Sequence, residues 1–186
     1  MSDVLATYRT QVSGLWSTRH RIVESKPGEP DVERGVLEIR RAPAGYVRGA
    51  TYRPASGEVL HFRRDPGLLR SQFSLWTEGR EWLGSSMRWH VARREITLST
   101  GNKPYRLLPL PSFRRGWRMV APKTGELARI LPKPLRRDAV IEVYRKVDFE
   151  LLLFAYFLGS QLYAETFWPA HAPEDAQAAL PRPSKA

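Results

Sequence analysis

The chain has 186 residues, of which 42% are hydrophobic and 26% are charged, a composition typical of a folded domain with a substantial core. Its formal net charge is +11 at pH 7, and such an excess attracts phosphate-bearing partners. It has no cysteine, which excludes disulfides, thiol catalysis, zinc–cysteine sites and palmitoylation, and no apolar run after Met1 that would act as a secretory signal.

The chain begins with a weakly amphipathic segment at residues 1–18, with apolar side chains at Leu5, Tyr8, Val12 and Leu15. We expect an N-terminal lead-in here, either a short docked helix or a frayed tail.

From residue 19 onward, short extended segments alternate with turn residues such as Pro54 and Gly57. Within Glu95–Thr100, Ile96 and Leu98 alternate with polar neighbours, which is the pattern of a strand that covers a core. The spacing of roughly ten residues is typical of an all-β barrel or sandwich. We predict about twelve strands, over residues 19–24, 36–41, 46–53, 58–64, 68–77, 81–83, 86–91, 95–100, 105–110, 117–121, 126–131 and 139–145.

The segment Val147–Trp168 has a different pattern. Leu151–Leu158 contains no polar residue, so a helix here is apolar on every face and must be buried in protein or in lipid. The Asp148 side chain can cap the first turn and Pro169 stops the helix, which predicts a helix over Phe149–Thr166. A membrane span needs about 20 mostly apolar residues, so we favour a helix buried in protein over a tail anchor or a surface helix.

The strands and the helix together predict the fold class. An open sheet of about twelve strands would have edges to protect, and closure removes them. A closed barrel of that size is too wide for strand side chains alone to fill, and an apolar helix could fill it. We therefore predict a mainly β protein, a closed antiparallel barrel of about twelve strands around a central hydrophobic C-terminal α-helix. Its expected organisation is a lead-in at 1–18, the barrel at 19–168 with its central helix at 149–166, and a disordered tail at 169–186.

The C-terminal part of the barrel region resembles members of the tubby C-terminal-like superfamily. The resemblance is carried by three successive segments, GWRMVAPKTGELARIL, AVIEVYRKVD and FELLLFAYFLGSQLY. The resemblance covers roughly Arg19–Trp168 and is nearest to the branch of phospholipid scramblases and LURP-one-related proteins. It implies a twelve-strand barrel around a central helix and a protein that binds phospholipid or phosphoinositide head groups. The chain departs from animal scramblases because it has neither their cysteines nor an acidic calcium-binding run of the DxDxDG kind.

The region Gly84–Val147 carries the whole charge excess. It contains 11 Arg and 4 Lys against four acidic residues, whereas the remainder of the chain has no net charge. The planar guanidinium group of arginine binds two phosphate oxygens at once. The residues that we expect to bind phosphate or lipid head groups are Arg114, Arg115, Arg118, Lys123, Lys133, Arg136 and Arg137. A solvated basic face without a ligand is the alternative interpretation.

No GxSxG, HExxH, P-loop or GxGxxG motif occurs, and the four histidines are scattered. We therefore expect no enzyme, no catalytic residue, no metal and no cofactor. The first hypothesis is a non-enzymatic binding module that engages anionic phospholipid or phosphoinositide head groups, in the cytoplasm or at the periphery of a membrane. The alternatives are a nucleic-acid-binding protein that uses the same charges, a tail-anchored membrane protein with scramblase-like activity, and an enzyme whose site carries none of these motifs.

Overall fold

The structure, a computed structural model of the chain, describes residues 3–14, 18–43, 46–65, 72–87, 95–101, 103–110, 116–134 and 137–165, with the backbone alone at residues 87 and 161–165. These ranges contain twelve strands and one helix, α1 Phe149–Glu165. The strands are β1 Ala6–Ser13, β2 Thr18–Ser25, β3 Val32–Arg41, β4 Val47–Pro54, β5 Leu60–Arg64, β6 Phe73–Thr77, β7 Trp82–Met87, β8 Ile96–Ser99, β9 Pro104–Pro109, β10 Trp117–Ala121, β11 Gly125–Pro132 and β12 Ala139–Val143.

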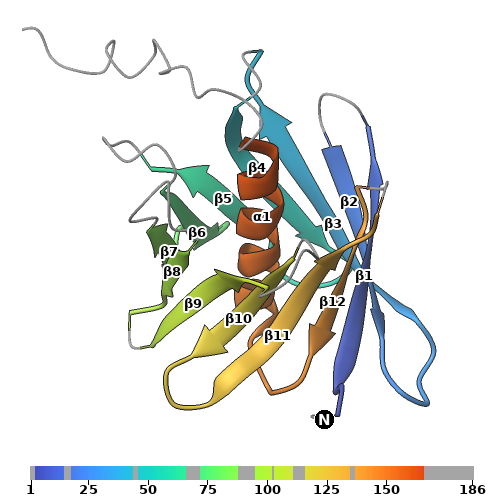
Figure 1. Cartoon of the computed structure of the whole chain (residues 1–186). Coiled ribbons are helices and arrows are strands. Elements are labelled where there is room, and N and C mark those ends of the chain that lie inside the picture. The colour runs from blue at the N-terminus through green and yellow to red at the C-terminus, as the bar shows by residue number, and fades with distance from the viewer. Residues whose placement is uncertain are drawn as a thin grey trace, which may run out of the picture.

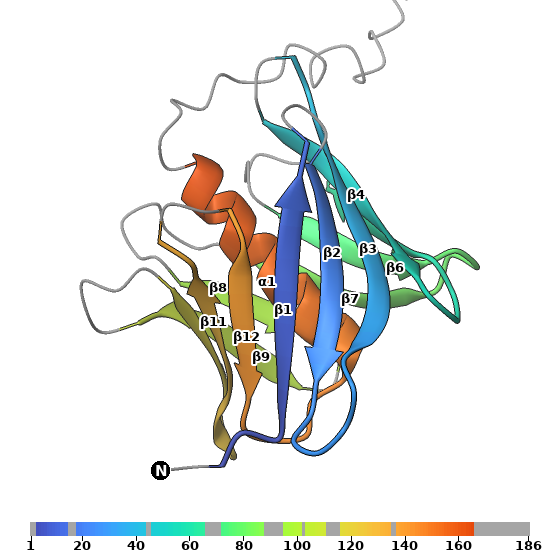
Figure 2. The ribbon, with the colours of Figure 1, turned by 90° about the vertical axis from the view of Figure 1, so that its right-hand side faces the viewer.

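All twelve strands form one closed antiparallel barrel (Figure 1). Each strand pairs with the next one along the chain, and β1 pairs with β12, where Tyr8 lies opposite Ile141. Figure 2 shows β1 lying between β12 and β2. The closed barrel with a C-terminal helix that the sequence predicts is confirmed.

The N-terminal segment differs from the prediction. Residues 6–13, expected in a lead-in at 1–18, form β1 and close the barrel between β2 and β12. Alternate residues Ala6, Tyr8 and Thr10 are buried. The lead-in prediction was wrong here because pairing on both edges stabilises a segment whose own apolar pattern is weak. The tail predicted at 169–186 lies outside the described residues.

The helix α1 lies inside the barrel. All nine residues of 151–159 are buried, so strands cover the helix on every side. The Phe157 ring packs on Phe62 and on Phe73, with ring centroids 5.0 Å apart in each pair. The helix begins at Phe149 as predicted and continues to Glu165. None of the helical segments described has the length and apolarity needed to cross a bilayer.

The start of α1 differs in one detail from the prediction. The Asp148 carbonyl oxygen accepts the first helical hydrogen bond, from the Leu152 amide, at 3.0 Å. Its carboxylate makes no capping hydrogen bond to any described residue, and its side chain is exposed to solvent. Asp148 therefore stands at the N-cap position but leaves its carboxylate available to solvent.

Candidate anion-binding site

Five arginines line an open hollow on the barrel wall, toward the end of the barrel where α1 ends. The hollow has a volume of about 670 Å³, and we call it the arginine hollow. No carboxylate occurs among the described residues that line it. These residues are Arg40, Arg41, Arg48, Gly49, Phe62, Arg63 and Arg64.

A β-bulge brings the side chains of β3 and β4 together in the hollow. Arg40 lies opposite Gly49, but Arg41 lies opposite Val47, so Arg48 is an extra residue in β4. Val47 and Ala50 are both fully buried, whereas Arg48 between them is exposed, so the Arg48 side chain lies on the outer face. A bulge is the usual means by which a sheet turns an additional side chain toward a site.

Gly49 lies between two arginines of the hollow. Its register partners on the neighbouring strands are Arg40 and Arg63, so the two arginines flank it across a gap of about 10 Å, or two strand spacings. A Cβ atom on Gly49 would lie 2.5 Å from the Phe62 carbonyl oxygen, a distance that side chains do not adopt. Glycine is therefore required for β4 to approach β5 this closely.

Aromatic faces hold two of these arginines in place. Arg64 donates a hydrogen bond from Nε to the Val47 carbonyl oxygen at 2.8 Å, and its guanidinium lies 5.0 Å from the Phe73 ring centroid. Arg63 lies 5.9 Å from the centroid of Trp76. Side chains that are held in this way lose less conformational freedom when they bind a ligand.

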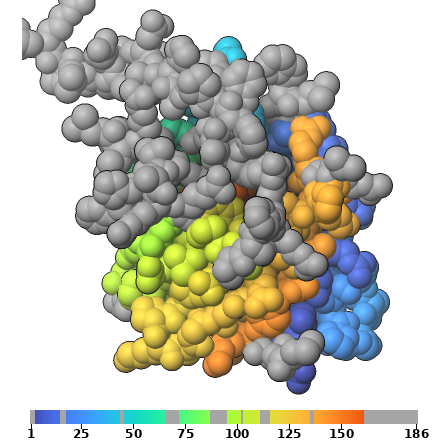
Figure 3. Space-filling view, viewed as in Figure 1, coloured from blue at the N-terminus to red at the C-terminus, as the bar shows by residue number. Residues whose placement is uncertain are grey.

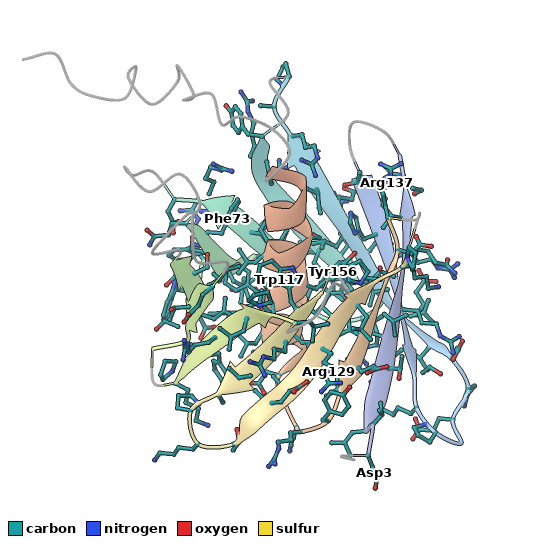
Figure 4. All side chains as sticks on the ribbon, viewed as in Figure 1. Asp3, Phe73, Trp117, Arg129, Arg137 and Tyr156 are labelled. Carbon is teal, nitrogen blue, oxygen red and sulfur yellow. The ribbon has the colours of Figure 1, made fainter. Side chains whose placement is uncertain are left out.

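The predicted residues Lys133 and Arg137 lie at this same end of the barrel, in the connection between β11 and β12 (Figure 4). Both are exposed, and the Lys133 amide donates to the Asp138 carbonyl oxygen across the loop. Burial, together with the positive charges of Arg41 and Arg137, lowers the pKa of His20 to about 4. Arg137 and the hollow's Arg41 therefore act on one buried histidine, which places both charges near it.

The other predicted residues do not join this group. Arg118 lies on the outer face of β10 between Leu108 and Arg129, on the wall that Figure 3 shows. Its buried Nε atom has no hydrogen-bond partner among the described residues. Lys123 lies in the turn that precedes β11, at the opposite end of that strand from Lys133. The remaining predicted residues, Arg114, Arg115 and Arg136, lie outside the described residues.

Charge is distributed unequally between the two ends of the barrel. Toward the end where α1 finishes, arginines predominate, and two nearby carboxylates are engaged by other groups: Asp65 accepts from the Ser74 hydroxyl, and Asp138 accepts from the Val12 amide. At the opposite end, carboxylates and cations are mixed, and Figure 4 shows Asp3 there. The arginine excess thus lies toward the end of the barrel where α1 finishes.

The described residues of the hollow are suited to binding an anion. They include neither a nucleophile nor a general base. Across the described ranges of the chain, no three His, Asp or Glu side chains form a group that could hold a metal ion. The chemistry available at this site is the recognition of anions.

Sequence reasoning missed the arginine hollow because its residues lie outside Gly84–Val147, in the remainder of the chain, whose charges sum to zero. Arg40 and Arg41 end one strand, Arg48 begins the next, and Arg63 and Arg64 end the third. Successive antiparallel strands bring alternating ends to the same side of a sheet. The position of these arginines at alternating strand ends therefore indicates that they lie together, although the bulge at Arg48 cannot be read from the sequence.

Comparisons with protein-family models, with curated proteins and with solved structures gave no match. The fold and the hollow define the chain as a helix-filled twelve-strand barrel with a basic recess. The resemblance to the tubby C-terminal-like superfamily stays a prediction from the sequence pattern.

Proposed function

We propose that this protein is a non-enzymatic binding module that holds the phosphate groups of anionic phospholipids in the arginine hollow. The observation that supports the proposal most strongly is the set of five arginines around Gly49, with no carboxylate among the described residues that line the hollow. Arginine binds phosphate through two parallel charge-assisted hydrogen bonds, which are roughly twice as strong as neutral ones. The proposed function is also the one that the resemblance to scramblase-like and LURP-one-related proteins implies.

The shape of the hollow favours a compact head group over a nucleic acid strand. Proteins that bind single strands combine a long basic groove with free aromatic faces on which bases stack. Here the ring faces of Trp76, Phe73 and Tyr46 each carry an arginine guanidinium, within 5.0 to 5.9 Å of the ring centroid. These faces are therefore occupied, whereas five arginine side chains line the hollow and can hold a compact phosphate group.

Vesicle sedimentation tests the proposal. The protein is mixed with phosphatidylcholine vesicles, with and without phosphatidylglycerol or a phosphatidylinositol phosphate, and the pelleted fraction is measured. We expect binding to the anionic vesicles alone. The binding should weaken as salt rises from about 0.1 M to about 1 M, because the Debye length falls from about 10 Å to about 3 Å.

Variants locate the binding on the barrel. Replacing Arg40 and Arg63 by Ala should weaken binding to anionic vesicles by roughly tenfold or more, since a hydrogen bond to a charged group contributes about 1.5–3 kcal/mol. The matched control is the double replacement of Lys123 and Arg145 by Ala. It removes the same charge from exposed positions at the other end of the barrel. Equal losses in the two double variants would contradict a site at the hollow.

Competition separates the sources of phosphate. Soluble inositol phosphates and inorganic phosphate should displace the protein from anionic vesicles if single phosphate groups occupy the hollow. Displacement by oligonucleotides at lower concentrations than inositol phosphates would instead favour a nucleic-acid partner. Absence of binding to every anionic ligand at low salt would reject the proposed function.

A further inference from the structure

A second cavity opens at the end of the barrel where α1 begins. Its volume is about 570 Å³, within the range of about 300–1,000 Å³ that small-molecule sites occupy. Its walls come from the ends of β3 to β7 and from the first turn of α1. Strand β4 runs from the arginine hollow at Arg48 to this cavity at Pro54, so the two sites lie at opposite ends of the same strand. We call this second cavity the mouth cavity.

The floor of the mouth cavity is apolar and held in place by the core. Leu60, Leu75 and Leu151 line it and are at most 5% exposed. Tyr52 forms one wall, because its ring packs 5.8 Å from the Phe149 ring. Contacts of this kind preform the site, so a ligand need not order it.

Gly35 lets the Tyr52 wall form. The Tyr52 hydroxyl donates to the Arg34 carbonyl oxygen at 2.5 Å and lies 2.9 Å from the position that a Cβ atom on Gly35 would take. Arg34 is the cation that lines the cavity among the described residues, and it is already engaged. Its guanidinium lies 5.0 Å from the Phe149 ring centroid and 3.7 Å from a Glu24 carboxylate oxygen.

Carboxylates surround the opening above this apolar floor. Glu33 is paired with Arg21, and Glu58 accepts a hydrogen bond from the Gly79 amide. The cavity is also lined by Asp148 and Glu150, which stand at the start of α1.

The Asp148 and Glu150 carboxylates have no ion pair or hydrogen bond with any described residue. Burial raises the pKa of Tyr52 to about 12; the positive charge of Arg34 opposes that rise and the negative charge of Glu150 adds to it, so both charges are felt at the cavity wall. The opening thus presents, next to apolar surface, two carboxylates that have no ion-pair partner among the described residues.

We propose that the mouth cavity binds a cationic amphiphile, a ligand with an apolar chain or ring and an ammonium head group. The apolar part lies against Leu60, Leu75 and Leu151, and the ammonium group lies at Asp148 and Glu150. An anionic ligand of the same shape is repelled by these carboxylates, and a neutral one gains no charge contact. The site is separate from the arginine hollow, so its occupancy does not depend on the function proposed above.

Three ligands with the same alkyl chain test the proposal: octylamine, octanol and octanoate. At neutral pH the amine is charged, because its pKa resembles the value of about 10.4 for lysine. Isothermal titration of the full chain should give the tightest binding for octylammonium, weaker binding for octanol and the weakest for octanoate. Octanoate that binds as tightly as octylammonium, or an absence of binding by all three, would overturn the proposal.

Two variants assign the binding to the cavity. The double variant Asp148→Asn and Glu150→Gln should reduce octylammonium affinity to about that of octanol, a loss on the order of tenfold, while octanol affinity stays the same. Ala55→Trp places a large ring at an exposed lining position and should block all three ligands. Octanoate binding that survives Ala55→Trp belongs to another site, such as the arginine hollow.

The matched control is the double variant Asp3→Asn and Glu78→Gln. It removes two carboxylates from the same end of the barrel, but neither residue lines the cavity. Octylammonium affinity should be unchanged in the control. An equal loss in both double variants would show that general charge, and not the mouth cavity, attracts the cation, and would reject the proposal.

Discussion

The His20 Nδ1 atom lies 2.6 Å from the hydroxyl oxygen of Tyr156 inside the barrel. This contact joins β2 to the central helix between residues that are 136 positions apart in the chain. The Tyr156 hydroxyl also donates to Thr10 Oγ1 at 3.2 Å, so one helix side chain bonds to two strands. Apolar contacts of the helix allow small rotations, whereas hydrogen bonds have a preferred geometry. The polar contact therefore fixes the rotation of the helix within the barrel.

Tyr156→Phe should lower the free energy of unfolding by about 1–3 kcal/mol. The substitution removes one hydroxyl and leaves His20 and Thr10 with buried polar atoms that lose a partner. Urea denaturation measures the change. The matched control is Tyr144→Phe, which removes a hydroxyl bonded to Glu142 at the surface and should change stability by less than about 0.5 kcal/mol. A similar cost for the two variants would argue against a role for the buried contact.

The free energy of unfolding should decrease as the pH is lowered, because of His20. Burial lowers its folded-state pKa to about 4, below the ordinary value of 6.5. The unfolded chain takes up a proton as the pH falls through 6.5, whereas the folded chain does not until about pH 4. The stabilisation is therefore fully present above pH 6.5 and is lost as the pH falls toward 4, by roughly 3 kcal/mol in total.

Urea midpoints at about pH 7.5 and about pH 4.5 measure this loss in the wild-type chain and in His20→Asn. The variant should show a smaller difference between the two pH values, since its side chain does not titrate. His61→Asn, on the outer face of β5, is the control and should keep the full pH dependence. A pH dependence unchanged in His20→Asn would show that other groups are responsible.

Phe154→Asp should prevent cooperative folding. Phe154 is fully buried and packs 5.9 Å from the Phe62 ring, so an aspartate there would be an unpaired buried charge that costs several kcal/mol. Circular dichroism during heating measures the transition. Lys146→Asp, at an exposed position just before the helix, should melt like the wild-type chain. A cooperative melt that survives Phe154→Asp would contradict the placement of the helix in the core and favour a tail anchor.

Gly35→Ala should destabilise the barrel by more than about 2 kcal/mol. Gly35 has φ +142°, and a Cβ atom there would lie 2.3 Å from the Arg53 carbonyl oxygen. Gly57→Ala is the control, because that residue also has a positive φ but no atom within 4 Å of the added carbon. The control should lose only the backbone term of about 1–2 kcal/mol. Equal losses would show that crowding at Gly35 is relieved without cost.

The predicted strand count agrees with the structure, but only because two errors cancel. The sequence pattern predicts a lead-in where β1 forms, and it predicts two separate strands on either side of Gly84 where the structure has the single strand β7. Gly84 lies in a continuous strand, where a Cβ atom would lie 3.0 Å from the Ser99 carbonyl oxygen of β8. Close approach of strands, like the pairing of β1, depends on partners distant in sequence, which a local pattern cannot show.

The central helix was predictable because its signal is local. Eight consecutive apolar residues after Asp148 predict burial on every face, whatever the topology. The arginine hollow was not predictable in the same way, since it depends on the register of Gly49 between Arg40 and Arg63. Net charge by region pointed to other basic residues, and of these Arg118 and Lys123 lie apart from the hollow.

The pairing of β1 with β12 determines when the chain can fold during its synthesis. Thr10 bonds to Ala139, 129 residues later, so the first strand leaves the ribosome long before its second partner exists. The helix that fills the interior follows later still. Until then the apolar inner faces of the strands have no cover, and one side of β1 has no partner. Assembly of this barrel must therefore wait until almost all of its strands and its helix have been translated, and a nascent chain held on the ribosome before residue 149 has no complete core.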